Sequence, residues 1–170
     1  LVNTYNLKQI GFFDDNFCLV KKRVHELCDL IIENNLHEKL SLAVQTRADN
    51  VVAGGEDVIR HMAEAGFTSI GYGLETGVQR LANLIRKDET IETHLEATQM
   101  AQKHGMKVAL FMIFGLPTET RKDRLESFKI VNDEFKIRET KYNNLIPYPG
   151  TPMFSELKDS GRVVITKNWG

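Results

Sequence analysis

The sequence predicts an α/β fold in which parallel strands form a β/α barrel, because short apolar runs alternate with amphipathic segments along it. Strand-like and helix-like segments follow one another about five times, at roughly thirty to forty residues per unit, and this order requires helical crossovers. Polar or turn-forming residues recur where the apolar runs end, which is where a barrel builds its sites. An open doubly wound sheet would also bind ligands there, but the chain carries no GxGxxG after a strand and no Walker sequence.

Composition limits the classes of protein that this chain can represent. Its 170 residues, 42% of them hydrophobic, suffice for one domain with a buried core. Lysine and arginine total 22 against 23 aspartates and glutamates, so there is no basic excess for a nucleic-acid backbone. No apolar run is long enough to span a bilayer, and we find no signal-like segment. Two cysteines are too few for a disulfide scaffold and indicate a reducing cytoplasm.

The first part of the chain predicts two strands, each followed by a helix. Residues 7–13 and 40–46 are the apolar runs that we interpret as strands. Apolar residues at helical spacing predict a helix over about residues 18–35, with Cys28 in its buried stripe. A second helix is expected over residues 54–65.

The middle of the chain predicts a third strand and a broken helical region. The strand covers residues 67–74 and leads into Glu75. Two amphipathic pieces follow, over residues 78–85 and 91–101. Charged residues 86–89 separate the pieces, and we interpret residues 86–88 as a solvated break.

A strand, a turn and a helix are expected around residues 107–120, KVALFMIFGLPTET. Residues 108–114 are too few for a free-standing buried helix and stop at a Gly-Leu-Pro turn, so they predict a buried strand. Gly115 has no Cβ, which lets the backbone approach a flat ligand. Thr120 and Asp123 predict the N-cap of the helix that follows.

The C-terminal part predicts one more strand and a short helix. The strand covers residues 141–148 and runs into a turn, and the helix covers about residues 152–159. The apolar run at residues 163–165 is too short to place.

The residues at the strand ends suggest a ligand before any family is considered. Asp14 and Asp15 could hold an ammonium group, Arg47 could pair with a carboxylate, and Glu75 could accept hydrogen bonds from a ribose diol. The strand that ends at Gly115 offers a flat apolar wall to an aromatic base. Charged residues at strand ends are ordinarily solvated, but their recurrence on successive strands favours a shared site. Together the groups match an amino acid joined to a nucleoside.

Five segments in order resemble the radical S-adenosylmethionine enzymes. They are IGFFDDNF, QTRAD, AGFTSIGYGLETG, GMKVALFMIFGLPTET and NLIPYPGTPMF. The resemblance extends from about residue 8 to residue 151 and is greatest to the subgroup that often carries a cobalamin-binding domain.

The resemblance implies an incomplete (βα)6 barrel of which this chain holds strands two to six. The barrel would cover about residues 7–151, and residues 152–170 would begin a C-terminal extension, all within one domain. The family binds a [4Fe–4S] cluster through a CxxxCxxC loop and cleaves S-adenosylmethionine reductively to a 5′-deoxyadenosyl radical that modifies a substrate, in part of the family by methyl transfer. An electron donor such as flavodoxin or ferredoxin is implied, and cobalamin is an optional further cofactor.

The resemblance also implies a set of residues that bind S-adenosylmethionine. The methionine amino group would lie near Asp14 and Asp15, after the second strand of the barrel. The carboxylate would lie near Arg47 at the third strand, and the ribose near Glu75 at the fourth. The adenine would lie against Ile113 and Gly115 at the fifth strand, and the far side would be closed after the sixth strand by Ile146, Pro147 and Tyr148. The sequence assigns no catalytic residue.

This chain also departs from the family pattern. Cys18 and Cys28 are its only thiols, and neither their spacing nor their position matches the cluster motif. We expect the cluster cysteines upstream of Leu1, so that this fragment alone is inactive; a cluster-free relative is the alternative. Glu119 lies one residue later than the family pattern gives, which leaves its role open. The five histidines lack metal-ligand spacing and are predicted to be surface or packing residues.

Two other classes of function stay open at this point. The chain would be a β/α-barrel enzyme of another chemistry if Glu75 and Asp14 acted as acid and base. It would be a non-catalytic module for binding S-adenosylmethionine or a partner if the barrel had lost its chemistry.

Overall fold

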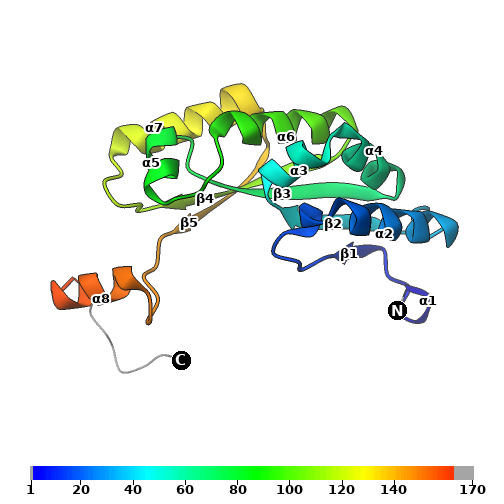
Figure 1. Cartoon of the computed structure of the whole chain (residues 1–170), viewed down its shortest axis with the longest axis horizontal. Coiled ribbons are helices and arrows are strands. Elements are labelled where there is room, and N and C mark those ends of the chain that lie inside the picture. Colours follow the sequence, from blue (N-terminus) through cyan, green and yellow to red (C-terminus); the bar gives the residue numbers. More distant parts are fainter. Residues whose placement is uncertain (1, 163–170) are drawn as a thin grey trace.

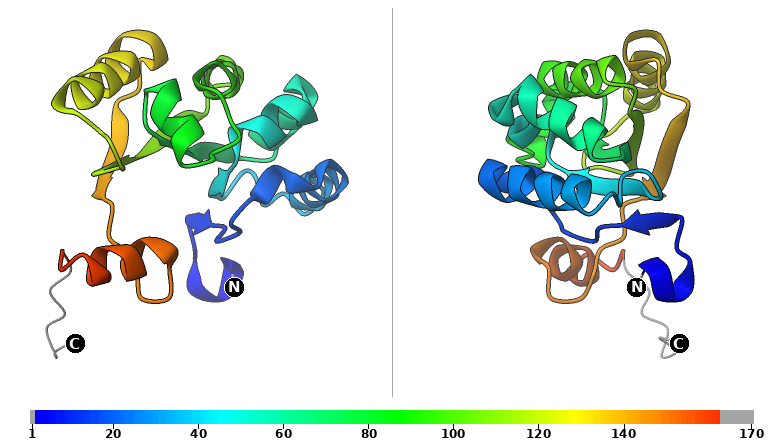
Figure 2. Two further views of the ribbon diagram at one scale, coloured as in Figure 1. Left: turned by 60° about the vertical axis from the view of Figure 1, so that its left-hand side comes forward. Right: turned by 90° about the vertical axis from the view of Figure 1, so that its right-hand side faces the viewer.

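The computed structural model describes residues 2–162 and contains one five-stranded sheet (Figure 1). All strands are parallel, and each pairs with the next in sequence order. They are β1 (Gln9–Gly11), β2 (Ser41–Thr46), β3 (Phe67–Glu75), β4 (Lys107–Phe114) and β5 (Glu139–Asn144). The sheet curls into part of a barrel wall with an open concave side (Figure 2). The predicted α/β class and partial barrel are therefore confirmed.

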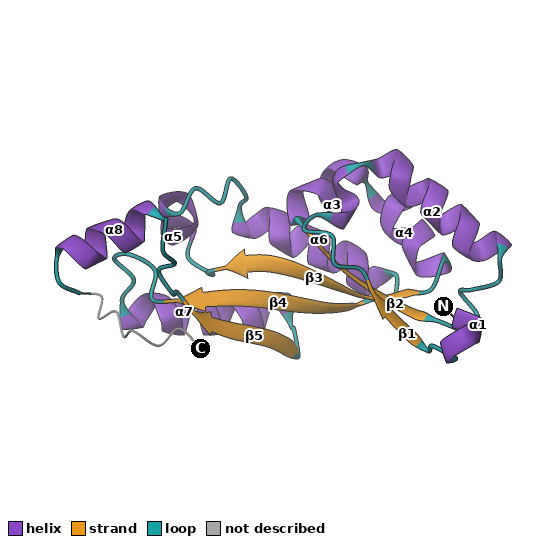
Figure 3. Ribbon diagram, turned by 90° about the horizontal axis from the view of Figure 1, so that it is seen from below, coloured by secondary structure: helices purple, strands orange, loops and turns teal. Residues whose placement is uncertain are grey.

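The crossover helices lie along the convex side of the sheet (Figure 3). They are α2 (Lys21–Glu33), α3 (Ala48–Gly54), α4 (Glu56–Glu64), α5 (Gln79–Leu84), α6 (Ile91–Lys103) and α7 (Arg121–Ile130), which continues into the π-helical turn η2 (Val131–Phe135). The short helix α1 (Val2–Tyr5) precedes β1, and the 3-10 turn η1 (Phe17–Leu19) precedes α2. Helix α8 (Pro152–Asp159) lies apart from the sheet, beyond the end of β5 (Figure 1).

The hydrophobic core fills the space between the convex side of the sheet and the helices. Alternate residues of the strands point into it, and the amphipathic faces of α2, α4 and α6 cover them. Each fully buried aliphatic side chain contributes about 1.5–3 kcal/mol relative to an exposed one. The largest fully buried side chains in this core include Leu42, Ile59, Met62, Phe67, Ile70, Tyr72, Leu74, Leu110 and Met112.

The concave side carries mainly small or polar residues at the alternate positions. A packed barrel interior is filled by layers of bulky branched side chains, which these residues do not supply. They leave a cavity of about 240 Å³ whose lining includes Gly11, Ala43, Gln45, Ser69, Gly71, Ala109, Phe111 and Lys141. The concave side of the sheet therefore lines a cavity and is not filled by a packed core.

Two strands differ from the prediction in their bounds. β1 is shorter than predicted, although the Phe12 N–H still donates to the Ala43 carbonyl at 2.9 Å. β5 begins at Glu139, two residues before the predicted start, because Glu139 and Thr140 pair with β4 despite their polar sequence. It ends at Asn144 rather than at residue 148, because β4 turns away at Gly115, whose φ is +87°. The partner strand, and not the sequence of β5, sets these bounds.

The helices mostly follow the predicted periodicity, with one correction. The helix predicted over residues 54–65 is α4, and a further helix that was not predicted, α3, precedes it and is capped at its C-terminus by Gly55, whose φ is +83°. α3 has seven residues, too few for a clear apolar stripe, so it was not predicted. Thr120 and Asp123 form the predicted capping box at the start of α7. The run at residues 163–165 lies outside the described residues.

Candidate functional site

A polar cavity of about 290 Å³ lies at the C-terminal ends of β2, β3 and β4. Strand ends, the segment after β1 and the connection between α5 and α6 all contribute to its wall. Its lining residues are Asp15, Gln45, Thr46, Arg47, Gly71, Gly73, Glu75, Lys87 and Phe111. Gln45, Gly71 and Phe111 also line the deeper cavity on the concave side, so the two cavities are neighbours. We call the cavity at the strand ends the mouth cavity.

Arg47 lies at the end of β2 and is held mainly by Asp49. Its Nε donates to Asp49 Oδ1 at 3.0 Å, and its NH2 group donates to Asp49 Oδ2 at 2.7 Å. This two-point pairing raises the pKa of Arg47 and lowers the pKa of Asp49. The same NH2 group lies 3.7 Å from Glu89 Oε2. Two of the five N–H groups of Arg47 are therefore engaged by Asp49.

Glu75 is the last residue of β3, and its strained backbone conformation places the side chain in the wall of the mouth cavity. Its φ is +63°, a left-handed conformation that non-glycine residues rarely adopt. Gly73 makes room for the carboxylate, because a Cβ at that position would lie 2.5 Å from Glu75 Oε1. Lys87 Nζ lies 3.3 Å from the same oxygen. The Glu75 side chain is 21% exposed, which leaves it open to a ligand.

Lys87 lies in the connection between α5 and α6 and reaches into the mouth cavity. Arg86 and Asp88 on either side of it have φ values of +53° and +57°. Lys87 Nζ lies between two carboxylates, at 3.3 Å from Glu75 Oε1 and 3.5 Å from Glu89 Oε2. Its side chain is 17% exposed. In contrast to Arg47, Lys87 has no two-point partner among the pairs found in residues 2–162, and its ammonium group donates one hydrogen bond, to Glu75.

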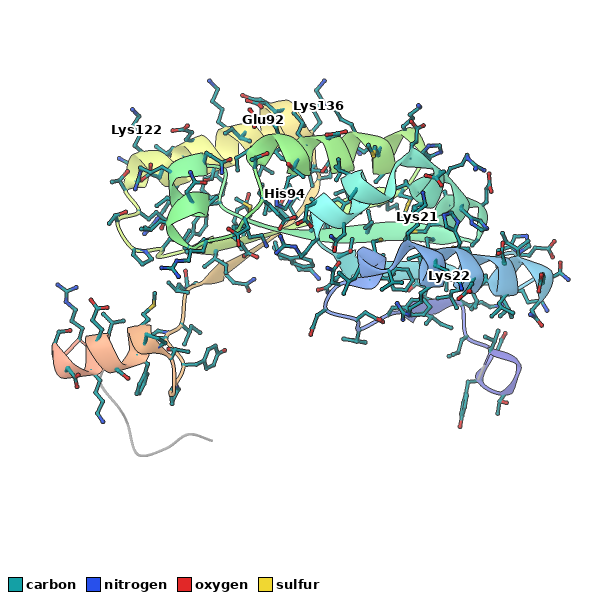
Figure 4. All side chains as sticks on the ribbon, viewed as in Figure 1. Lys21, Lys22, Glu92, His94, Lys122 and Lys136 are labelled. Atoms are coloured by element: carbon teal, nitrogen blue, oxygen red, sulfur yellow. The ribbon has the colours of Figure 1, made fainter. Side chains whose placement is uncertain are left out.

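A buried polar layer supports the cavity from below. Glu89 is fully buried, and its Oε1 accepts a hydrogen bond from the Asp49 N–H at 3.1 Å. His94 of α6 lies behind it, between the helix and the sheet (Figure 4), and meets the ring of Tyr72 edge-on. Burial lowers the pKa of His94 to about 4, so the imidazole is neutral at pH 7. Glu89 therefore faces two cations and one neutral ring.

The structure brings three of the predicted site residues together. Asp15, Arg47 and Glu75 all line the mouth cavity. Asp14 does not, because its Oδ1 accepts from Arg23 NH2 of α2 at 2.8 Å. An acid and base pair made of Glu75 and Asp14 is therefore not assembled in this cavity.

The other predicted residues lie at the far ends of β4 and β5. Ile113 lines an apolar cavity of about 420 Å³ between β4, the end of α5 and α8, together with Leu84, Ile85, Leu116, Pro117, Leu145 and Met153. Gly115 lines the adjacent cavity with Thr118 and Glu156. Ile146 and Tyr148 are 59% and 64% exposed, and Pro147 lies between them. The adenine-side assignments stay predictions.

Glu119 stabilises the turn after β4 through hydrogen bonds. Its Oε2 accepts from the Gly115 N–H at 2.7 Å and from Arg124 Nε at 2.8 Å. The carboxylate thus fixes the turn that carries Gly115 and anchors it to α7. This contact answers the role that the sequence left open for Glu119.

Sequence reasoning missed Lys87 and Glu89. Residues 86–88 were interpreted as a solvated break, and this is wrong for Lys87, which lines the mouth cavity. Arg86 and Asp88 are exposed and have left-handed φ values, whereas Lys87 and Glu89 point inward. A run of four charged residues carries no sequence signal that would distinguish these two pairs.

The described residues do not fit an iron–sulfur cluster. Cys18 and Cys28 are both buried, and burial raises the pKa of their thiols to about 11 and about 12. Cys18 packs near Met62 of α4, on the helix side of the sheet, whereas the mouth cavity lies at the strand ends. Within residues 2–162, no group of three His, Cys, Asp or Glu side chains could hold a metal ion. No helix of this part of the chain is long and apolar enough to cross a membrane.

Comparison with known families then decides the class. The model of the radical SAM superfamily matches residues 2–131. This chain belongs to the radical SAM superfamily. The family predicted from the five sequence segments is therefore confirmed.

Curated relatives and solved structures agree with this assignment. The chain is 28% identical over 165 residues to an uncharacterized methyltransferase of Pyrococcus horikoshii, which covers 97% of the chain and 34% of the relative. It is 26% identical to the anaerobic magnesium-protoporphyrin IX monomethyl ester cyclase of Cereibacter sphaeroides, covering 96% of the chain and 26% of the relative. The chain thus spans about a third or less of the length of these two relatives.

A solved structure shares the fold. It is the radical S-adenosylmethionine methyltransferase TsrM from Kitasatospora setae, with cobalamin and a [4Fe–4S] cluster bound. The TM-score is 0.77 at 17% identity, over 94% of this chain and 30% of that chain. The partial barrel described here is therefore a recurring part of larger radical SAM proteins.

Proposed function

We propose that this chain is the S-adenosylmethionine-binding wall of a radical SAM enzyme that cleaves S-adenosylmethionine reductively to modify a substrate. The observation that carries this proposal is the mouth cavity, where Arg47, Glu75 and Lys87 meet at the C-terminal ends of parallel strands. Membership of the superfamily supports the reaction class. The contribution of this chain is to bind and orient the nucleoside and the amino acid parts of the ligand.

The charge of the mouth cavity and its floor suits this ligand. S-adenosylmethionine carries a sulfonium, an ammonium and a carboxylate, so that it is a net cation at neutral pH. Four carboxylates face two cations at this site, which gives a net attraction for such a ligand. The carboxylates are Asp15, Asp49, Glu75 and Glu89, and the cations are Arg47 and Lys87.

Each polar group has a role that matches its position. Glu75 accepts hydrogen bonds from the ribose diol, because it is partly exposed at the end of β3. Lys87 pairs with the carboxylate of the ligand, with Arg47 as a second and less available cation. Asp15 lies on the β1 side of the cavity and accepts from the ammonium group. Asp14 can accept from the ammonium group only after its hydrogen bond with Arg23 is broken.

The adenine belongs against the end of β4. Ile113 and its neighbours form an apolar wall there, and Gly115, which has no Cβ, lets the base approach the backbone closely. Ile146, Pro147 and Tyr148 follow β5 and close this side of the site when the ligand is bound. Residues 152–170, which begin with α8, form the start of the C-terminal extension.

The complete protein needs partners that this chain does not contain. The cluster cysteines come from outside the chain, since Cys18 and Cys28 do not fit the cluster. A flavodoxin or ferredoxin supplies the electron. Methyl transfer with cobalamin is the substrate chemistry that we favour, because the relatives include an uncharacterized methyltransferase and the structural neighbours include TsrM.

The test uses the complete natural protein, reconstituted with iron and sulfide under anaerobic conditions. Binding of S-adenosylmethionine is measured by equilibrium dialysis, and 5′-deoxyadenosine is measured after reduction. Glu75→Gln and Lys87→Met are expected to weaken binding by about 10-fold or more, because each removes a charged hydrogen-bond partner. The matched controls are Glu92→Gln and Lys122→Met, two exposed positions on the outer helices (Figure 4). Equal binding by all four variants, or no 5′-deoxyadenosine from the wild type, would refute the proposal.

A further inference from the structure

Glu89 is a fully buried carboxylate directly below the mouth cavity. Its Oε1 accepts from the Asp49 N–H, but its Oε2 has no hydrogen-bond donor among the described residues. Three nitrogens surround Oε2 at slightly longer range. They are Lys87 Nζ at 3.5 Å, Arg47 NH2 at 3.7 Å and His94 Nε2 at 3.8 Å.

The charge on Glu89 has to be balanced by the two cations. An unpaired buried carboxylate is strongly unfavourable, and breaking a buried pair costs about 3–5 kcal/mol. His94 does not supply a charge, because it is buried away from water. Glu89 is thus the one carboxylate that lies within ion-pair range of both Arg47 and Lys87 in residues 2–162.

The position of Lys87 depends on a balance between two carboxylates. Its Nζ donates a long hydrogen bond to Glu75 Oε1 at 3.3 Å and lies 3.5 Å from Glu89 Oε2, so that the charge of Glu89 attracts it from the other side. If Glu89 lost its charge, the ammonium group would move closer to Glu75. That movement would occupy the oxygens that the ribose diol needs and would withdraw the cation from the carboxylate of the ligand.

We propose that Glu89 is a positioning residue for S-adenosylmethionine, which acts through Lys87 and Arg47 and does not touch the ligand. It attracts the two cations toward the floor of the mouth cavity and keeps Lys87 from a closer pairing with Glu75. The inference rests on the proposed function, because it assumes that the mouth cavity binds S-adenosylmethionine.

A double-mutant cycle on the complete protein tests the inference. The dissociation constant for S-adenosylmethionine is measured by calorimetry for the wild type, Glu89→Gln, Lys87→Met and the double variant, with Glu92→Gln as control. Glu89→Gln is expected to weaken binding by about 10-fold, which is 1.4 kcal/mol. The loss of affinity in the double variant is expected to be smaller than the product of the two single losses, because the part of the Glu89 effect that passes through Lys87 is absent once Lys87 is replaced.

The outcomes separate the inference from the proposed function. No binding by the wild type would overturn the proposed function itself. Wild-type binding with an unchanged constant for Glu89→Gln would overturn only the inference. Losses that simply multiply in the double variant would also overturn it, because they indicate a general structural role. If Glu89→Gln does not fold, Glu89→Asp is used instead, because it retains the charge but places it farther from Lys87. Weaker binding by Glu89→Asp at an unchanged melting temperature would support the inference. Unchanged binding would overturn it.

Discussion

Gly73→Ala is the substitution that most directly tests the geometry of the mouth cavity. An alanine Cβ at this position would lie 2.5 Å from Glu75 Oε1 and 3.2 Å from Lys87 Nζ. The first contact is about 1 Å shorter than ordinary van der Waals contact, so the carboxylate has to turn away. Both contacts involve the ends of flexible side chains, so the backbone of β3 can remain in place.

The stability effect of Gly73→Ala is expected to be small and its binding effect large. Extra atoms in a packed site cost about 1–3 kcal/mol, but alanine also restricts the unfolded chain, which offsets about 0.4–1 kcal/mol. Displacing Glu75 would remove the charged hydrogen bonds that we propose it makes to the ribose, each worth about 1.5–3 kcal/mol. We therefore expect S-adenosylmethionine to bind about 10- to 100-fold more weakly, at a loss of stability below about 2 kcal/mol.

The assay compares Gly73→Ala with Gly11→Ala in the complete protein. Gly11 lies on the concave side of β1, and a Cβ there would meet nothing within 4 Å. Calorimetric titration gives the dissociation constant, and urea denaturation gives the free energy of unfolding. Wild-type binding by Gly73→Ala would refute the role of Glu75, and so would an equal loss of binding in Gly11→Ala.

Three further predictions concern the fold. Thr120→Ala removes the capping box of α7 and should lower the free energy of unfolding by about 1 kcal/mol in urea denaturation, whereas an unchanged value would contradict the cap. His94 has a folded pKa of about 4, lowered by burial, so the unfolded chain binds more protons between about pH 6.5 and pH 4. Stability should therefore fall across this window as the pH is lowered, by an amount on the order of 3 kcal/mol, and His94→Gln should flatten that part of the profile. The raised thiol pKa values of Cys18 and Cys28 predict slow alkylation by iodoacetamide at pH 8 in the folded protein and fast alkylation in urea, and equal rates would contradict their burial.

The sequence was sufficient for the parts of the fold that depend on local pattern. Apolar runs located β2, β3 and β4, and the recurrence of polar residues at their ends predicted where Arg47 and Glu75 would meet. The capping box at Thr120 and Asp123 was also visible, because it depends on residues three positions apart. These features need no knowledge of distant contacts.

The parts that the sequence did not predict depend on neighbours that are far apart along the chain. β5 has a polar sequence and is a strand because β4 pairs with it. Lys87 and Glu89 point inward because Glu75 and Arg47 lie across the cavity from them, about twelve and forty residues earlier. No periodicity of a four-residue charged segment contains that information.

The strained backbone around the mouth cavity adds an independent argument for a functional site. Glu75, Arg86 and Asp88 are non-glycine residues with left-handed φ values, and they lie at or beside the two side chains that share the ion pair. Each such residue costs on the order of 1 kcal/mol, which packing has to offset. A connection that served only to join α5 to α6 could relieve this cost with glycine. The strain lies on both sides of the Glu75–Lys87 ion pair, which agrees with the ligand site that we propose there.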